Sequence, residues 1–371
     1  MLPVLNLTAF RFAAVRAALV AFTALAAAPA MAQILPASAR SLALAGNDTA
    51  VARAFGAISV NPAGLAMPGS EFSLTVAPVR ASVGTGPVSL ADWKNHEGKV
   101  VSHATKTKWM DGIDSADGQH ISAGAGTAGV ALTFWNVGLQ HSTILSISGS
   151  LPPDVMEALL FGNAGRTCPR ERTGCEPRPQ SLSFAQGSVD ASVTSTVALS
   201  AAFPLAEWME DVEMIQAFDQ LSLGVTVTYT QGHAVAVAES SGSIPFDRPR
   251  AEFGGSIIHT PVITEGDAFS HYLNNGSGLG LDLGVMFALD SLPELTLGAA
   301  VQNVFNTFSW DTSKLVSQNA AGSIDNGKVN LDLDLGGGGD PYDAAAPAVK
   351  ERIEDLTFKP TVRIGAAYDI L

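Results

Sequence analysis

The stretch from Leu221 to Thr230, LSLGVTVTYT, alternates between large apolar and small or polar side chains at every step. Successive side chains of a β-strand point to opposite faces, so this pattern predicts a strand with one oily face and one small polar face. The oily parity consists of Leu221, Leu223, Val225, Val227 and Tyr229. The other parity consists of Ser222, Gly224, Thr226, Thr228 and Thr230.

The same alternation predicts further strands over residues 189–203, 278–289, 295–305 and 358–370. These strands run about ten to fifteen residues, which is longer than usual in soluble sheets and suits a tilted strand crossing a bilayer. A soluble sandwich with one buried and one solvated face would show the same period, so the alternation alone leaves both architectures open.

Aromatic residues favour the membrane architecture, because they gather near both sets of strand ends as two interfacial girdles would. One set consists of Phe203, Phe218, Phe287 and Tyr368, and the other of Phe184, Phe305, Phe308, Trp310 and Phe358. We therefore predict an all-β fold, an antiparallel transmembrane β-barrel, over residues 70–371. The rival is an exported soluble β-protein.

The connections between the predicted strands differ in length. Residues 135–137 and 290–294 form short turns, whereas residues 149–180, 242–274 and 311–356 are long, polar or irregular. If the chain starts at the periplasmic side, the long connections lie outside the cell, as in outer-membrane barrels. One exception is a periplasmic excursion over residues 204–217, which could hold a short helix. Residues 88–114 lack strand alternation and could form a surface loop or part of an internal plug.

The first 32 residues have the features of an export signal. Arg11 and Arg16 are their only charges, and an apolar run follows that ends at Ala30-Met31-Ala32, a site with small residues for cleavage. The apolar run is short for a membrane anchor, which is the alternative reading. We therefore expect residues 1–32 to be removed and the mature chain to start at Gln33.

The charge balance excludes nucleic acid as a partner. Without the two signal arginines, 19 basic residues remain against 35 acidic ones, a net charge near −16. Such a chain repels a phosphate backbone.

The two cysteines lie close together in residues 167–176, TCPRERTGCE. An exported chain meets an oxidising compartment, so we predict a disulfide between Cys168 and Cys175 in an external loop. The alternative, a metal site, would need further ligands, and none lies nearby in the sequence.

No catalytic or cofactor motif stands out, and we predict no enzyme activity, no cofactor and no metal site. The seven histidines show no paired metal-ligand spacing. The run GSGLGLDLG over 276–284 resembles a phosphate loop, but its glycines lie on the small-residue parity of a predicted strand and no helix follows. The acidic residues of 311–354 do not match a calcium loop, so we interpret that segment as a solvated external loop.

One short segment after the predicted signal resembles a known family. Residues 39–46, ARSLALAG, and 61–65, NPAGL, are similar to the N-terminal segment of the FadL-type outer-membrane transport family and its relatives, such as PorV and TraF-like proteins. The resemblance implies that residues 33–69 form a hatch inside the barrel. Small residues can pack against an inner wall, and an Asn-Pro step followed by glycine favours a sharp turn. The hatch turn would be Asn61, Pro62, Ala63 and Gly64, and the alternative is an ordinary surface turn.

Two features depart from that family's pattern. Its acidic pair is replaced by Ala52-Arg53-Ala54-Phe55, and its terminal aromatic strand by Asp369-Ile370-Leu371. With further strands expected near residues 71–83, 121–135 and 137–148, the sequence predicts eight strands, which allow either a small closed barrel or a fragment of a larger one. We favour the fragment, truncated at the C-terminus, because eight strands leave no room for a hatch.

The resemblance implies passive uptake of hydrophobic small molecules across the outer membrane of a Gram-negative-type bacterium. The expected partners are then outer-membrane lipid and a hydrophobic small-molecule substrate. The alternative is a PorV-like barrel without transport activity, which binds a protein partner in secretion or surface attachment.

Overall fold

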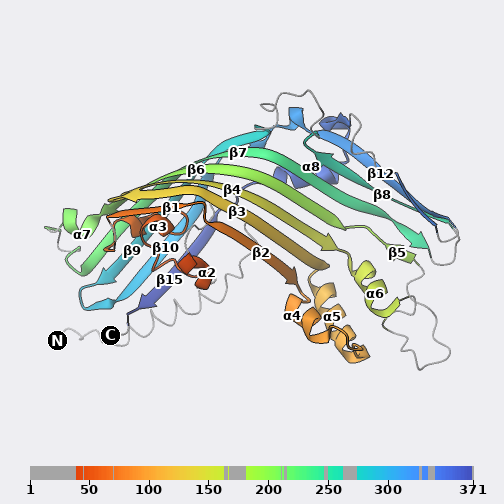
Figure 1. Ribbon diagram of the computed structural model, residues 1–371, viewed down its shortest axis with the longest axis horizontal. Coiled ribbons are helices and arrows are strands. Elements are labelled where there is room, and N and C mark those ends of the chain that lie inside the picture. The colour runs from red at the N-terminus through yellow and green to blue at the C-terminus, as the bar shows by residue number, and fades with distance from the viewer. Residues whose placement is uncertain are drawn as a thin grey trace, which may run out of the picture.

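The computed structural model describes residues 39–369 except 45, 70, 163–165, 167–180, 210, 213–214, 246–249, 262–273, 326–327 and 333–338. The predicted signal (residues 1–32) and the predicted Cys168–Cys175 disulfide lie outside the described residues. Figure 1 shows long strands that form one broad, strongly curved sheet, with short helices at its ends and on its concave face.

Fifteen strands form this sheet, and their pairings are antiparallel. The strands are β1 (Phe72–Val76), β2 (Val79–Gly86), β3 (Gln119–Phe134), β4 (Val137–Leu151), β5 (Ser181–Ser183), β6 (Ser188–Pro204), β7 (Phe218–Pro245), β8 (Arg250–His259), β9 (Gly276–Leu289), β10 (Leu292–Asn306), β11 (Ser309–Trp310), β12 (Val316–Asp325), β13 (Lys328–Asp332), β14 (Asp340–Pro341) and β15 (Thr361–Tyr368).

The helices are short. They are α2 (Ala39–Ala43), α3 (Phe55–Ile58), α4 (Leu90–His96), α5 (His103–Ser115), α6 (Pro153–Phe161), α7 (Leu205–Trp208) and α8 (Pro347–Asp355), with 3₁₀ turns η1 (Pro62–Leu65), η4 (Thr312–Lys314) and η5 (Tyr342–Ala344). In Figure 1, α4, α5 and α6 lie at one end of the sheet and α7 at the other. Within the described part of the chain, none of the helices is long and apolar enough to cross a membrane.

The sheet forks at β7. One side of β7 pairs with β6, which continues through β4 and β3 to β1 and β2. On its other side, residues 218–232 pair with β9 and residues 236–243 pair with β8. One branch continues from β9 to β10 and β15, and the other from β8 to β12 and β13.

The oily parity of the central strands faces outward and the small polar parity faces inward. On β6, Leu199 is 56% exposed while its neighbour Ser200 is fully buried, and on β7 Leu223 is 43% exposed while Thr226 is fully buried. Buried hydroxyls pair across the inner face, for example Ser200 with Thr226 at 2.7 Å between their oxygens. A soluble sheet would bury its oily face instead.

A local irregularity reverses this pattern in the upper half of β7. The register with β6 shifts between Val193 and Thr194, opposite residues 232–234 of β7. A one-residue shift exchanges the two faces of a strand. As a result Val235 and Val237 point inward and are buried against α8.

The prediction of an all-β, antiparallel fold is confirmed at that level. Within the described residues the outer edges, β1–β2 and β15, do not pair with each other, so the sheet is open. Closure into a barrel stays a prediction. The eight strands counted in the sequence are all present, and the sheet adds β8, β12 and β13 and the very short strands β5, β11 and β14.

Two of the long connections predicted from the sequence contain further elements, because tertiary pairing orders them. Residues 242–274 contain β8, and residues 311–356 contain β12, β13 and α8 rather than only a solvated acidic loop. Residues 88–114 form α4 and most of α5. Helix α5 packs on α6 in a cluster of Val88, Trp109, Met110, Ile113, Met156 and Leu160, and Trp93 of α4 contacts Trp109.

Candidate functional site

Residues 48–67, here called the inner segment, lie on the concave face of the sheet. This segment contains α3 and η1, and every residue in it is buried or half-buried. Its apolar side chains pack against Ala198 and Ala202 of β6. Figure 1 shows α3 beneath β1 and β3, inside the curve of the sheet.

Asn61 connects the inner segment to itself and to the sheet. Its side chain is fully buried. The Oδ1 atom accepts a hydrogen bond from the Ala63 nitrogen at 3.2 Å, which caps the start of η1. The Nδ2 atom donates to the carbonyl oxygens of Thr49 at 3.0 Å and of Val285 at 3.1 Å. One side chain therefore satisfies three backbone groups where water has no access.

A pair of glycines receives the Asn61–Ala63 turn. Gly224 of β7 and Gly284 of β9 are directly opposite each other in the sheet. A Cβ on Gly224 would overlap the backbone of Ala63, and a Cβ on Gly284 would overlap the side chain of Asn61. The paired glycines thus form a notch in the inner wall that admits a backbone turn.

A second glycine pair receives the start of the inner segment. Gly298 of β10 lies opposite Gly365 of β15. A Cβ on Gly298 would come within 2.6 Å of the Thr49 carbonyl oxygen, and one on Gly365 within 3.0 Å of the Ala50 nitrogen. Two glycine notches on different strand pairs therefore hold residues 49–50 and 61–63.

Arg53 is the charged group at the centre of this contact. Its guanidinium donates to the carbonyl oxygens of Ala50 at 3.3 Å and Ala52 at 2.9 Å, and it contacts the Met286 sulfur at 2.8 Å. Burial, with a smaller effect from the charge of Arg40, lowers the pKa of Arg53 to about 10. The side chain stays charged at neutral pH. Its hydrogen bonds go to the inner segment and its sulfur contact goes to β9.

Helix α8 fills another part of the concave face. Val349 and Ile353 pack with Val235, Val237, Ile258 and Trp310. Arg352 forms a two-point ion pair with Asp190 on β6, and its Nε lies 3.1 Å from Asp190 Oδ1. The concave face is therefore occupied by two separate elements, the inner segment and α8.

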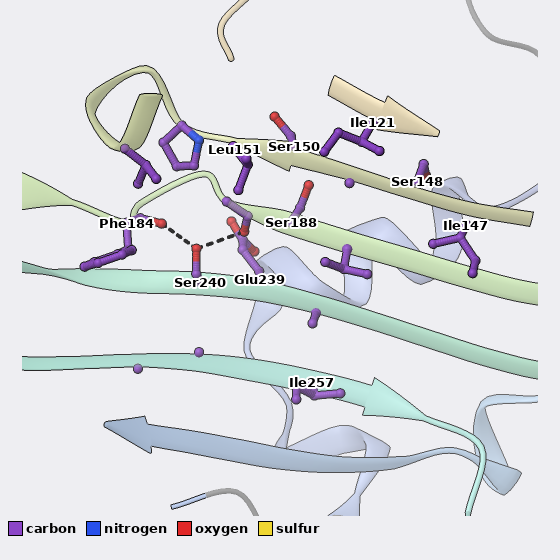
Figure 2. A pocket seen from close by; sticks show the side chains of 18 of the residues that line it. Ile121, Ile147, Ser148, Ser150, Leu151, Phe184, Ser188, Glu239, Ser240 and Ile257 are labelled. Carbon is purple, nitrogen blue, oxygen red and sulfur yellow. Dashed lines mark hydrogen bonds between the residues drawn. The ribbon is translucent and has the colours of Figure 1, made fainter. Parts of the chain in front are cut away.

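The opposite, convex face carries an apolar groove with a volume of about 580 Å³. Its lining residues come from β3, β4, β6, β7, β8 and β12, from the turn before β6 and from the start of α6 (Figure 2). Glu239 is the one charged residue in the lining. None of the lining residues belongs to the inner segment, so this groove is not a space between the segment and the wall.

The role of residues 61–64 as a hatch turn stays a prediction, and sequence reasoning missed the glycines that contact this turn. Asn61, Pro62, Ala63 and Gly64 are all buried on the concave face rather than in a surface turn. The glycine pairs were missed because the pairing of β7 with β9 and of β10 with β15 is long-range. In the sequence these pairs are visible only as glycines at the alternating small-residue positions of four predicted strands.

Among the described residues, no group of three or more His, Cys, Asp or Glu side chains could hold a metal ion. The two cysteines predicted to pair lie outside the described part.

Comparison with known proteins gave one finding. A family model described as "F plasmid transfer operon, TraF, protein" matches residues 63–370. Comparisons with curated proteins and with solved structures gave no match. The assignment to the FadL-type family is therefore wrong. That assignment depended on a short small-residue segment before residue 66, whereas the matched region contains the whole sheet.

Proposed function

The chain belongs to the family of F plasmid transfer operon TraF proteins, and on this premise we propose that it is an outer-membrane β-barrel with a closed interior that binds a protein partner in a transfer or secretion apparatus. Plasmid transfer is the process named in the family's description. The occupied concave face is the observation that carries the proposal.

The outward oily parity supports a membrane location. Large apolar side chains such as Leu199, Leu223 and Val227 are exposed on the convex face, while the hydroxyls behind them bond to one another. Exposed apolar surface of this extent is costly in water and favourable in lipid. An export signal, as predicted over residues 1–32, would bring the chain to the outer membrane.

Closure of the barrel is proposed between β1–β2 and β15. In lipid, unpaired strand edges leave backbone groups unsatisfied. The inner segment already bridges the two edges, because the Phe55 nitrogen donates to Ser73 Oγ on β1 at 3.0 Å while residues 49–50 contact Gly365 on β15.

A closed interior supports partner binding over conduction. The inner segment is held by the Asn61 hydrogen bonds and by two glycine notches, so opening a path would break many close contacts at once. We therefore expect purified protein in planar bilayers to show no steady conductance.

The test of this function is plasmid transfer. Donor cells that lack this protein should transfer a mobilisable plasmid less often than parental donors, and the gene supplied in trans should restore transfer. Unchanged transfer frequency, together with recovery of the protein in the outer membrane, would reject the partner role and leave the membrane location standing.

Uptake of a hydrophobic small molecule is the second candidate function, and the apolar groove in the wall favours it. Cells with and without the protein would be compared for uptake of a labelled hydrophobic compound. Equal uptake would remove this candidate.

A further inference from the structure

We infer that the groove on the convex face binds one aliphatic chain of a lipid from the surrounding membrane. This inference rests on the proposed membrane location, and it holds with either candidate function. The groove has a defined floor, an end wall and a consistent chemistry.

The floor contains two small residues, Gly149 and Ala238, on a face that is otherwise large and apolar. Directly paired residues share a face, so Gly149, Val189, Ala238 and Ile257 form one outward row across β4, β6, β7 and β8. The equivalent row nearer the other end of the sheet contains Leu139, Leu199, Val227 and Leu281. The change from large to small side chains makes the depression.

The end wall is a turn pinned onto the sheet. Residues 184–187 join β5 to β6, and the Ser240 hydroxyl donates to the carbonyl oxygens of Phe184 and Gly187, as Figure 2 shows. A Cβ on Gly187 would overlap Ser240 Oγ, so only glycine allows this contact. Because Ser240 is already bonded, the wall offers a ligand an apolar surface rather than a free donor.

The lining of the groove carries little charge, which favours binding of an uncharged part of a ligand. No basic residue lines the groove. Glu239 pairs with Ser188 and Ser256, so its side chain belongs to the inward parity. A carboxylate or phosphate would therefore be desolvated here without a counter-charge, which is unfavourable. A volume of about 580 Å³ is in the usual range for small-ligand sites.

The position of the groove suits a lipid tail. It lies where β4 ends at Leu151 and β6 begins at Ser188, next to the start of α6. A chain can enter it along the oily convex face while its head group stays beyond the strand ends.

The test uses the full-length protein reconstituted in vesicles that contain phosphatidylethanolamine with a photoactivatable diazirine in one acyl chain. Cross-links are mapped to peptides by mass spectrometry. We expect labelling to concentrate on residues 147–155, 184–189 and 238–240. Even labelling along the whole convex face would overturn the inference.

Two substitutions sharpen the test. Ala238→Trp fills the floor and should lower groove labelling by about tenfold, because it removes the apolar space that drives binding. Ala201→Trp, on the same outward face of β6 but outside the groove, is the matched control and should leave labelling unchanged. Val155 of α6 also lines the groove, and Val155→Trp replaces Ala238→Trp if that variant does not assemble. Groove labelling that survives the filling variant overturns the inference.

A second arm separates lipid from a free ligand. The protein in lipid-free detergent is exposed to a neutral diazirine-bearing fatty alcohol. Labelling by the alcohol with none by the phospholipid would overturn lipid binding in favour of a free hydrophobic molecule. Protein absent from the membrane fraction would instead reject the proposed location itself.

Discussion

At the residue scale, the inner segment is held by close backbone approach. Asn61 supplies three hydrogen bonds without access to water, and the glycine pairs Gly224–Gly284 and Gly298–Gly365 remove the side chains that would keep the backbone away. Ser222 Oγ adds a bond to the Ala63 carbonyl at 2.8 Å. Small residues hold the inner segment against the sheet, whereas large apolar side chains hold together the core of a soluble protein.

Asn61→Ala should leave two buried carbonyls and one backbone nitrogen without their partner. We expect a loss of about 1–3 kcal/mol in the free energy of unfolding, measured by urea unfolding in phospholipid bilayers, and faster entry of small antibiotics into cells. Asn95→Ala, at an exposed position of α4, is the control and should change neither. Parental stability and antibiotic entry in Asn61→Ala would show that the turn does not close the interior.

Gly224→Ala should displace the Asn61–Ala63 turn, because the new Cβ would overlap the Ala63 backbone. Overpacking of this kind costs about 1–3 kcal/mol. The displaced segment should become sensitive to trypsin after Arg53, read by the size of the membrane-protected fragment. At Gly86 a Cβ would meet nothing within 4 Å, so Gly86→Ala should keep parental trypsin resistance.

At the scale of elements, β7 and α8 organise the sheet. The long strand β7 serves two branches, because β9 and β8 pair with different parts of it. Its inward face changes parity near residue 233, and α8 covers the apolar part of that face. The Arg352–Asp190 ion pair ties α8 to β6, two elements with no sequence proximity.

Substitutions in this ion pair should reveal an energetic coupling between Arg352 of α8 and Asp190 of β6 in the free energy of unfolding. Its side chains are 33% and 16% exposed, whereas those of the Lys359–Asp355 pair are 64% and 68% exposed. A double-mutant cycle with Arg352→Gln and Asp190→Asn should give a coupling of about 1–3 kcal/mol in unfolding free energy. The cycle with Lys359→Gln and Asp355→Asn should give about 0–0.5 kcal/mol. Equal couplings would mean that α8 is not anchored by Arg352.

At the scale of the whole molecule, the convex surface is the inverse of a soluble protein's surface. Exposed leucines and valines cover the outer face of the central strands, and buried Ser and Thr hydroxyls lie behind them. Most charged residues of the described part of the chain lie outside this apolar outer face, in loops, helices and strand ends.

The substitution Leu223→Arg distinguishes a convex face that contacts lipid from one that contacts water. On a lipid-facing strand the substitution should cost up to about 2–4 kcal/mol, the value for arginine at the bilayer midplane, because the guanidinium is poorly solvated in lipid. The heat-modifiable gel shift of the folded protein should then fall to lower temperature. Leu159→Arg, at an exposed site on α6, should keep the parental shift. In a soluble sheet both variants would behave alike, which would count against the proposed membrane location.

The sequence by itself determined the strands, because a period of two is a local property of an extended backbone and is legible from ten residues of LSLGVTVTYT. It also indicated the Asn61–Pro62 turn, whose conformational restraints are local as well. It left open which face of the strands is outward, since a soluble sandwich shows the same alternation. The tertiary structure decided that the oily face is exposed. It also decided the fork at β7, the strands β8, β12 and β13 inside predicted loops, and the glycine pairs that receive the inner segment. Each of these depends on which distant strands pair, and a one-residue shift of register, as near residue 233, changes the face of every residue beyond it.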